Sequence, residues 1–317
     1  MIQRVVTLAR NIHCEIGKSI SLIPKSLKIV DVLIPTRGVN NTYLSRSIST
    51  FLSNLFVKSI IIVVDNDNDL IYQNVLNNFS RNRKIQVYKS PGRGISRTLN
   101  YGISKSNAKY IARQDDDDMS SFFRIYIQLL YMFITRSDLV FTNMQKIDSG
   151  GKRLVHLEYR RPMGRVYPVG MLIGCLVSHA TLLGKRSIFD KYNFTNDILA
   201  EDYDLWMRIV NKYRIANISL KLYKFRIHPE QITKKNLVIT QHDHLYEVWL
   251  NLATEIGITS TILSKDIFLI PYSQKTSKGQ IEQINLDLFY AQIIQQLGKL
   301  PNRFFKYYKS IFEDIYK

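Results

Sequence analysis

The sequence of 317 residues carries a formal charge of +18, with 44 Lys and Arg against 26 Asp and Glu. Such an excess favours nucleic acid, an anionic membrane surface or a phosphorylated substrate as the partner. The two cysteines, Cys14 and Cys175, are far apart and outside any metal-ligand spacing, which excludes a disulfide-rich scaffold and indicates a reduced compartment. The hydrophobic fraction of 45% is sufficient for a sizeable core.

The N-terminal basic segment, residues 1–27, lacks the pattern of a signal peptide, because no small-residue cleavage site follows a long apolar run. It is predicted to be either an amphipathic helix on a membrane or an ordinary packing helix. A second stretch, Val166–Gly184, contains no Lys, Arg, Asp or Glu, but Pro168 and Gly174 interrupt it. We expect buried strand and loop there, and no transmembrane helix in the chain.

Short apolar strands alternate with helical patterns from residue 28 to residue 118, which predicts an α/β fold with a mostly parallel sheet flanked by helices. Ligands of such sheets bind beyond the carboxyl ends of the strands. Polar loops follow four of the predicted strands, and we expect them to converge on one edge of the sheet: Pro35–Gly38, Asp65–Asp69, Pro91–Gly94 and Asp115–Asp118.

Four consecutive carboxylates, Asp115–Asp118, end the strand Lys109–Arg113 and follow a strongly basic stretch. In an extended backbone, residues i and i+2 point the same way, so Asp115 and Asp117 are expected to face one site. Hard oxygen ligands of this kind suit Mg²⁺ or Mn²⁺ beside a substrate phosphate. On the run alone, a solvated acidic turn is an equal alternative; the basic neighbourhood favours a metal–phosphate site. Asp118 is predicted to cap the next helix.

The second half has fewer regular patterns. A helix with an acidic start is expected at Ala200–Val210, where the helix dipole favours ionised Glu201 or Asp202 at neutral pH. From about residue 236 the chain is predicted to be helical, basic and aromatic, with a polar break at Ser273–Gly279. We interpret residues 28–235 as the catalytic domain and 236–317 as a helical C-terminal extension. The pair His242 and His244 is expected to be solvated.

Six short motifs occur in the order and spacing of one known family. They are Val32–Thr36, Ile62–Asp65, Gly94–Asn100, Tyr110–Asp118, Ala200–Trp206 and Phe225–Pro229. Over roughly residues 28–233 the chain resembles family-2 bacterial glycosyltransferases of the kind that builds O-antigen or capsule repeat units. The resemblance implies a GT-A fold and an inverting transfer of a sugar, typically from a UDP-hexose, to a glycan hydroxyl.

The resemblance also implies roles for individual residues on the donor side. Pro35, Thr36 and Arg37 would surround the nucleotide, and Asp65 would accept from the uracil imide. Gly94 would let the backbone approach the nucleotide. The remaining donor contacts would be Arg97, Asn100, Asp115 and Asp116, with Asp116 near the ribose or sugar. The family usually has Tyr-Asn where Arg37 and Gly38 stand here.

For the chemistry, the resemblance implies that Asp115, Asp117 and His228 hold Mn²⁺ or Mg²⁺ and that Asp202 is the general base. From the residues alone, His228 is a structural or surface histidine. Glu201, Trp206 and His179 are predicted to lie on the acceptor side. The acceptor would be an undecaprenyl-diphosphate-linked sugar at the inner face of the cell membrane, where a cytoplasmic, peripheral enzyme would use its excess of basic residues.

Two other functions fit parts of the pattern. A sugar-phosphate nucleotidyltransferase also uses metal carboxylates, but Pro35–Gly38 is a poor version of the glycine-rich basic loop expected after its first strand. A non-enzymatic nucleic-acid-binding protein would explain the charge and the aromatic residues near Phe304–Lys309. Against the latter, an acidic cluster without a metal repels phosphates, and we expect no nucleic-acid partner.

Overall fold

The computed structural model describes residues 27–154, 164–198, 200–228, 242–259, 263–264, 267–268 and 283–316. Residues 1–26 of the N-terminal basic segment and the polar break at Ser273–Gly279 lie outside these residues. Within the described residues, no helix combines the length and the apolar character needed to cross a membrane.

Alternating strands and helices form the first half, as the sequence predicts. The elements are β1 Val30–Thr36, α2 Asn41–Leu52, β2 Val57–Val64, α3 Asp69–Phe79, β3 Ile85–Lys89, α4 Ile95–Lys105, β4 Tyr110–Arg113, β5 Met119–Ser120, α5 Arg124–Thr135 and β6 Leu139–Ile147. The second half contains β7 Gly164–Arg165, α6 Pro168–Ile173, the 3-10 helix η3 His179–Thr181, β8 Leu183–Lys185, α7 Arg186–Phe189, α8 Glu201–Ile209, β9 Ile215–Arg226, α9 His242–Glu255, α11 Gln283–Gly298 and α12 Asn302–Tyr316.

One sheet runs through the molecule in the order β3-β2-β1-β4-β8-β6-β9-β5, with β7 beside β9. Strands β1, β2, β3 and β4 pair in parallel, as do β6 and β9. Strand β8 is antiparallel to both of its neighbours, and β5 is antiparallel to β9. The sheet is therefore mostly parallel, with antiparallel strands in the second half.

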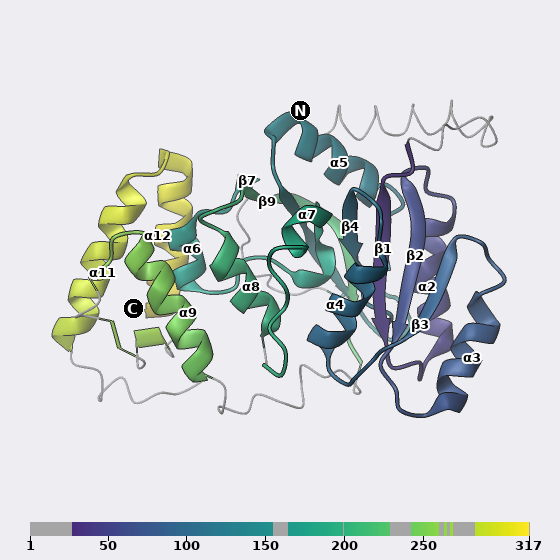
Figure 1. Ribbon diagram of the computed structural model, residues 1–317. Coiled ribbons are helices and arrows are strands. Elements are labelled where there is room, and N and C mark those ends of the chain that lie inside the picture. The colour runs from purple at the N-terminus through teal and green to yellow at the C-terminus, as the bar shows by residue number, and fades with distance from the viewer. Residues whose placement is uncertain are drawn as a thin grey trace.

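The sheet separates two apolar layers, because successive residues of its buried strands point to opposite faces. On one face, Val32 and Ile34 pack with residues of α2 and α5. On the other, Leu33 and Ile61 pack with α4, α6 and α8. Helices α9, α11 and α12 lie at the α6 side of the molecule (Figure 1) and contribute to the same core cluster as that second layer.

The uncharged stretch Val166–Gly184 is buried, but part of it is a helix rather than the expected strand and loop. Pro168 is the first residue of α6, where proline is well tolerated in a helix, and the residues from Val169 to Ile173 are buried. Tyr308 of α12 packs directly on Gly170, where an added Cβ would lie 2.4 Å from the tyrosine ring. A glycine at this position therefore allows the C-terminal helix to pack against α6.

Candidate active site

The polar loops expected at one sheet edge do come together. Because β1, β2 and β3 are parallel, their carboxyl ends share an edge, and the amide of Asp65 donates to the carbonyl of Thr36 at 2.7 Å. The amide of Gly94 donates to Oδ2 of Asp65 at 3.1 Å. Gly94 has φ +106°, a backbone conformation that favours glycine at this turn. The loops after β1, β2 and β3 thus form one continuous surface.

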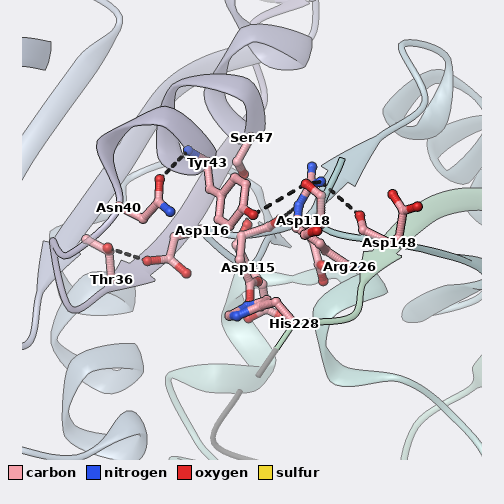
Figure 2. Close-up of polar contacts among 12 residues, drawn as sticks. Thr36, Asn40, Tyr43, Ser47, Asp115, Asp116, Asp118, Asp148, Arg226 and His228 are labelled. Atoms are coloured by element: carbon pink, nitrogen blue, oxygen red, sulfur yellow. Dashed lines mark hydrogen bonds and ion pairs between the residues drawn. The ribbon is translucent and has the colours of Figure 1, made fainter. Parts of the chain in front are cut away.

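The carboxylates of the four aspartates after β4 point in two different directions. Asp115, Asp117 and Asp118 each offer a carboxylate oxygen, and these oxygens lie within 4.8 Å of one another. Asp116 instead turns toward β1, where its carboxylate accepts a hydrogen bond from the hydroxyl of Thr36 (Figure 2). Asp115 and Asp117 are together, as expected, but the chain bends at Asp116 and Asp117, and Asp118 joins the cluster, so strand alternation alone does not produce the arrangement.

Asp118 is not the helix cap that the sequence suggested. It is fully buried, and its Oδ1 accepts a hydrogen bond from the backbone amide of Arg226 at 2.6 Å. Helix α5 begins at Arg124 without a side-chain cap. The short strand β5, which directly follows Asp118, pairs with β9 and turns the carboxylate toward the end of that strand.

His228 joins the aspartates through the same strand pairing. Met119 pairs with Lys224 and Ser120 with Tyr223, so the chain beyond β9 passes beside the aspartate run. Nε2 of His228 lies 2.8 Å from Oδ2 of Asp117. A histidine that seemed isolated in the sequence is therefore at the acidic cluster, and its ring also packs 5.9 Å from the ring of Tyr43.

Burial and mutual repulsion make these carboxylates reluctant to ionise. Burial, and next Asp115, raise the pKa of Asp117. Burial raises the pKa of Asp118 well above its usual range, with Asp115 and Asp117 adding to the effect. Burial also raises the pKa of Asp116 to about 7. Clustered carboxylates with a histidine nitrogen form a hard O and N donor set, which fits Mn²⁺ or Mg²⁺.

Two buried arginines support the aspartate loop, and neither role was predicted from the sequence. Nη2 of Arg113 donates to Oδ1 of Asp115 at 2.6 Å. The guanidinium of Arg124 is fully buried and donates to Gln114 Oε1 at 3.0 Å and to Ser120 Oγ at 2.7 Å. Burial lowers the pKa of Arg124 to about 10, so it remains a cation at neutral pH. Its position on the apolar face of α5 was the available sequence signal.

The predicted donor-side residues lie around this edge in different environments. Pro35 and Thr36 are buried at the end of β1, whereas Arg37 is exposed and its carbonyl accepts from Asn66 at 2.9 Å. Arg97 forms a two-contact ion pair with Asp197, at 2.8 and 2.5 Å. The side-chain amide of Asn100 donates to the carbonyl of Phe194 and accepts a hydrogen bond from the backbone amide of Phe194. Nucleotide contacts by these residues stay a prediction.

On the predicted acceptor side, Glu201 and His179 lie together. Oε1 of Glu201 is 3.7 Å from Nδ1 of His179. Burial, and next the neighbouring Asp202, raise the pKa of Glu201 to about 8, so of the two carboxyls expected to offer an ionised group, Glu201 is not the one favoured at neutral pH. Burial and Arg113 lower the pKa of His179 well below its usual range. A protonated carboxyl and a neutral imidazole therefore meet here at pH 7.

Trp206 is fully buried and packs edge-on against Phe141, with ring centroids 5.1 Å apart. It also packs edge-on against His179, at 6.1 Å. Trp206 therefore packs against the ring of His179 from the core side. Asp202 is partly exposed at the start of α8, and its Oδ1 accepts from the amide of Tyr203 at 2.8 Å.

The expectation that His244 is only solvated is wrong. Its Nε2 lies 2.9 Å from Oδ1 of Asp204, a fully buried carboxylate of α8. The other oxygen of Asp204 accepts from Thr195 at 2.7 Å and from Arg208 at 2.7 Å. Asp204 thus connects α8 to the preceding loop and to α9, so the helix that carries Asp202 in its first turn is fixed partly by a C-terminal helix.

Comparisons with known proteins identify the family of the chain. The model of the family described as Glycosyl transferase family 2 matches residues 31–192. The chain is 28% identical over 222 residues to the O-antigen biosynthesis glycosyltransferase WbnJ of Escherichia coli, which covers 67% of this chain and 86% of that protein. An uncharacterized glycosyltransferase of Rickettsia bellii is 28% identical over 210 residues, covering 65% of this chain but 30% of that longer protein.

Among solved structures, residues 1–349 of TarS from S. aureus, crystallised in complex with UDP-GlcNAc, are similar with a TM-score of 0.60. The match covers 91% of this chain and 89% of that one, at 14% sequence identity, and so concerns the fold. The fold is the GT-A type of α/β fold, as the sequence resemblance implies. The chain belongs to glycosyl transferase family 2.

Proposed function

We propose that this glycosyltransferase moves a sugar, with inversion, from a nucleotide-sugar, typically a UDP-hexose, to a hydroxyl group of a glycan acceptor. The observation that carries the proposal is the meeting of Asp115, Asp117 and His228 at the sheet edge that also holds the Asp65–Gly94 contact. A charged cluster beside a surface suited to a nucleotide matches a donor that carries a sugar on a diphosphate.

On the donor side, Thr36 and Asp116 share a hydrogen bond at the end of β1. Together with Asp65 they present hydroxyl and carboxylate groups to a base and ribose at this edge. The structure of TarS with UDP-GlcNAc supports a UDP-linked donor by analogy of fold. The sugar itself has no residue-level signature here, so the hexose assignment comes from the family.

Asp115, Asp117 and His228 would hold a divalent cation, Mn²⁺ or Mg²⁺. When bound, such an ion would neutralise charge on the diphosphate of the leaving group. The chain supplies the rest of the electrostatic setting: Arg113 beside Asp115 and the buried Arg124 behind it keep the aspartate loop in place. These cations also offset the repulsion among the carboxylates.

For the acceptor, Asp202 would take the proton from the attacking hydroxyl as its oxygen bonds to the anomeric carbon and the nucleoside diphosphate departs. General-base assistance of this kind contributes on the order of 10²- to 10⁴-fold to a rate. Glu201, kept protonated by burial, can donate a hydrogen bond to an acceptor oxygen and does not compete for the proton. Positioning of Asp202 by α8 then matters more than its basicity.

The acceptor would be a lipid-diphosphate-linked sugar, and the chain would act at an anionic membrane surface. The name of the E. coli relative supports O-antigen synthesis as the context, and the charge of +18 supports attraction to anionic lipid. Exposed Lys299 and Lys306, in and beside α12, are candidates for that contact.

A donor screen tests the function directly. The full chain is incubated with a panel of UDP-sugars and a synthetic lipid-diphosphate-linked acceptor, with and without Mn²⁺, and released UDP is measured. The proposal expects UDP release that requires both acceptor and metal for at least one donor. Release of pyrophosphate from a sugar phosphate and UTP would instead support a nucleotidyltransferase.

A further inference from the structure

Arg226, two residues before His228, contacts three separate segments beside the acidic cluster. Its side chain is fully buried. Its Nε donates to the carbonyl of Asp117 at 2.7 Å, and its Nη1 donates to the carbonyl of Ser149 at 2.7 Å. Its guanidinium also lies 4.5 Å from the centre of the Tyr43 ring, within the range of a cation–π contact.

These contacts form a compact arrangement around the end of β9. In Figure 2, Arg226 lies between Tyr43 of α2 and Asp148 of the turn that follows β6. The hydroxyl of Tyr43 donates to the carbonyl of Ser149 at 3.3 Å, which connects α2 to the same turn. The backbone amide of Arg226 bonds Asp118 at 2.6 Å. Arg226 therefore contacts the aspartate run through both its backbone and its side chain.

We infer that Arg226 is a positioning residue that holds Asp117 and His228 at the spacing needed for a shared metal ion. The inference rests on the proposed metal role of these two residues. A ligand just beyond the end of a strand needs contacts that fix it, and His228 lies two residues past the end of β9 at Arg226. A planar guanidinium that bonds the backbone of Asp117 while His228 follows two residues later fixes both ligands relative to each other.

Contacts of this kind usually matter to metal affinity. Replacing a residue that orients a metal ligand typically lowers metal affinity 10- to 100-fold. Lysine in place of Arg226 keeps the charge but cannot make the same set of directed contacts to Asp117 and Ser149. We therefore expect Arg226→Lys to bind Mn²⁺ about 10- to 100-fold more weakly than wild type, without donor or acceptor present.

A double-mutant cycle separates positioning from general destabilisation. Mn²⁺ binding is measured by electron paramagnetic resonance for wild type, Arg226→Lys, His228→Ala and the double variant, and urea unfolding is measured in EDTA. With His228 absent, Arg226 has no histidine to hold at a fixed spacing from Asp117, so adding Arg226→Lys should change affinity less than about threefold. Tyr43→Phe, which keeps the ring over Arg226, is the matched control and should stay within about twofold of wild type.

The following results would overturn the inference. Arg226→Lys that binds Mn²⁺ like wild type would show that the spacing does not depend on Arg226. An equal loss of affinity with and without His228 would show a general effect on the fold. If wild type binds no Mn²⁺, the metal role in the proposed function fails with it. If Arg226→Lys does not fold, Arg226→Gln replaces it in the same cycle, with the same expected and overturning results.

Discussion

His228 and Asp117 are 111 residues apart in the sequence, yet Nε2 of the histidine lies 2.8 Å from Oδ2 of the aspartate. The pairing of β5 with β9 brings them together, because it aligns the residues just after the aspartate run with those just before His228. The proposed metal site would thus be assembled from two distant stretches by one short strand, and its proposed ligands come together through that pairing.

Replacement of Asp117 tests the cluster itself. Asp117→Asn removes one of the carboxylates whose oxygens lie within 4.8 Å of one another. We expect Mn²⁺ affinity, measured by calorimetry, to fall at least about tenfold, because a neutral amide is a weaker ligand for a hard cation. Asp148→Asn, a nearby carboxylate whose Oδ1 accepts from Lys152, is the control and should leave affinity unchanged. Equal Mn²⁺ affinities for Asp117→Asn and wild type would show that Asp117 is not a metal ligand.

Replacement of Asp202 tests the general base. Asp202→Asn should lower kcat for transfer by about 10²- to 10⁴-fold, since the amide cannot accept the acceptor proton. UDP-sugar binding should remain within about twofold of wild type, because the binding surface for the donor does not include Asp202. Asp190→Asn, which removes an exposed partner of Arg186, is the control for both measurements. Full turnover by Asp202→Asn would assign the proton to another residue.

Replacement of Arg124 tests the support behind the aspartates. In Arg124→Met, the buried carbonyl of Arg113 and Oε1 of Gln114 each lose the hydrogen bond from Arg124, and Gln114 Oε1 keeps the one from Ser120. Each such loss costs about 1–3 kcal/mol, so we expect the free energy of unfolding to fall by at least about 2 kcal/mol in urea titrations. Arg186→Met, on the surface with a single ion pair to Asp190, should change stability by less than about 0.5 kcal/mol. Similar small losses for both variants would mean that the buried network contributes little.

The raised pKa of Glu201 predicts a pH dependence of stability. The carboxyl has a pKa of 4.5 when unfolded and about 8 when folded, so only the unfolded chain releases this proton between those values. Its contribution is therefore present below pH 4.5 and is lost as pH rises toward 8. Glu201→Gln, which cannot ionise, should become progressively more stable than wild type from pH 5 to pH 8 in EDTA.

Urea unfolding of Glu201→Gln and wild type at pH 5, 6, 7 and 8 measures this difference. Subtracting one from the other cancels the carboxylates common to both proteins. A constant difference across these pH values would show that Glu201 ionises normally. The same substitution at an exposed position, Glu255→Gln, is the matched control.

Substitution of exposed lysines tests the proposed membrane contact better than removal of α12. Tyr308 is fully buried against Gly170, so deleting residues 300–317 would disrupt the core as well as the surface. Lys299→Glu with Lys306→Glu changes exposed positions and should reduce binding to vesicles that contain anionic lipid, since each basic residue near such a surface contributes on the order of 1 kcal/mol. Unchanged binding would place the membrane contact elsewhere; Lys58→Glu with Lys224→Glu is the charge-matched control.

The strand pattern could be predicted from the sequence, as could the shared site of Asp115 and Asp117, because each concerns residues that are close together in the chain. Buried parallel strands appear as continuous apolar runs such as Ile60–Val64, and their loops must share an edge. Asp115 and Asp117 share one site, as expected, although the chain bends at Asp116 and Asp117 instead of continuing as a strand. The path from Val30 to Asp118 could therefore be predicted almost element by element.

The remaining features depend on contacts between residues far apart in the chain. Asp118 could not be recognised as a buried partner of Arg226, because β5 is only two residues long and has no apolar pattern. The contact between His244 and Asp204 requires α9 to pack on α8. The pKa of Glu201 depends on burial, which its position at a helix start does not reveal.

The most direct test of the central claim is UDP binding by calorimetry with Mn²⁺ and with EDTA. If the aspartates and His228 hold a metal ion against a nucleotide diphosphate, UDP should bind wild type at least about tenfold more tightly with Mn²⁺. The same advantage should be lost in Asp117→Asn. Equal UDP affinity with Mn²⁺ and with EDTA would contradict a metal-dependent donor site at this cluster.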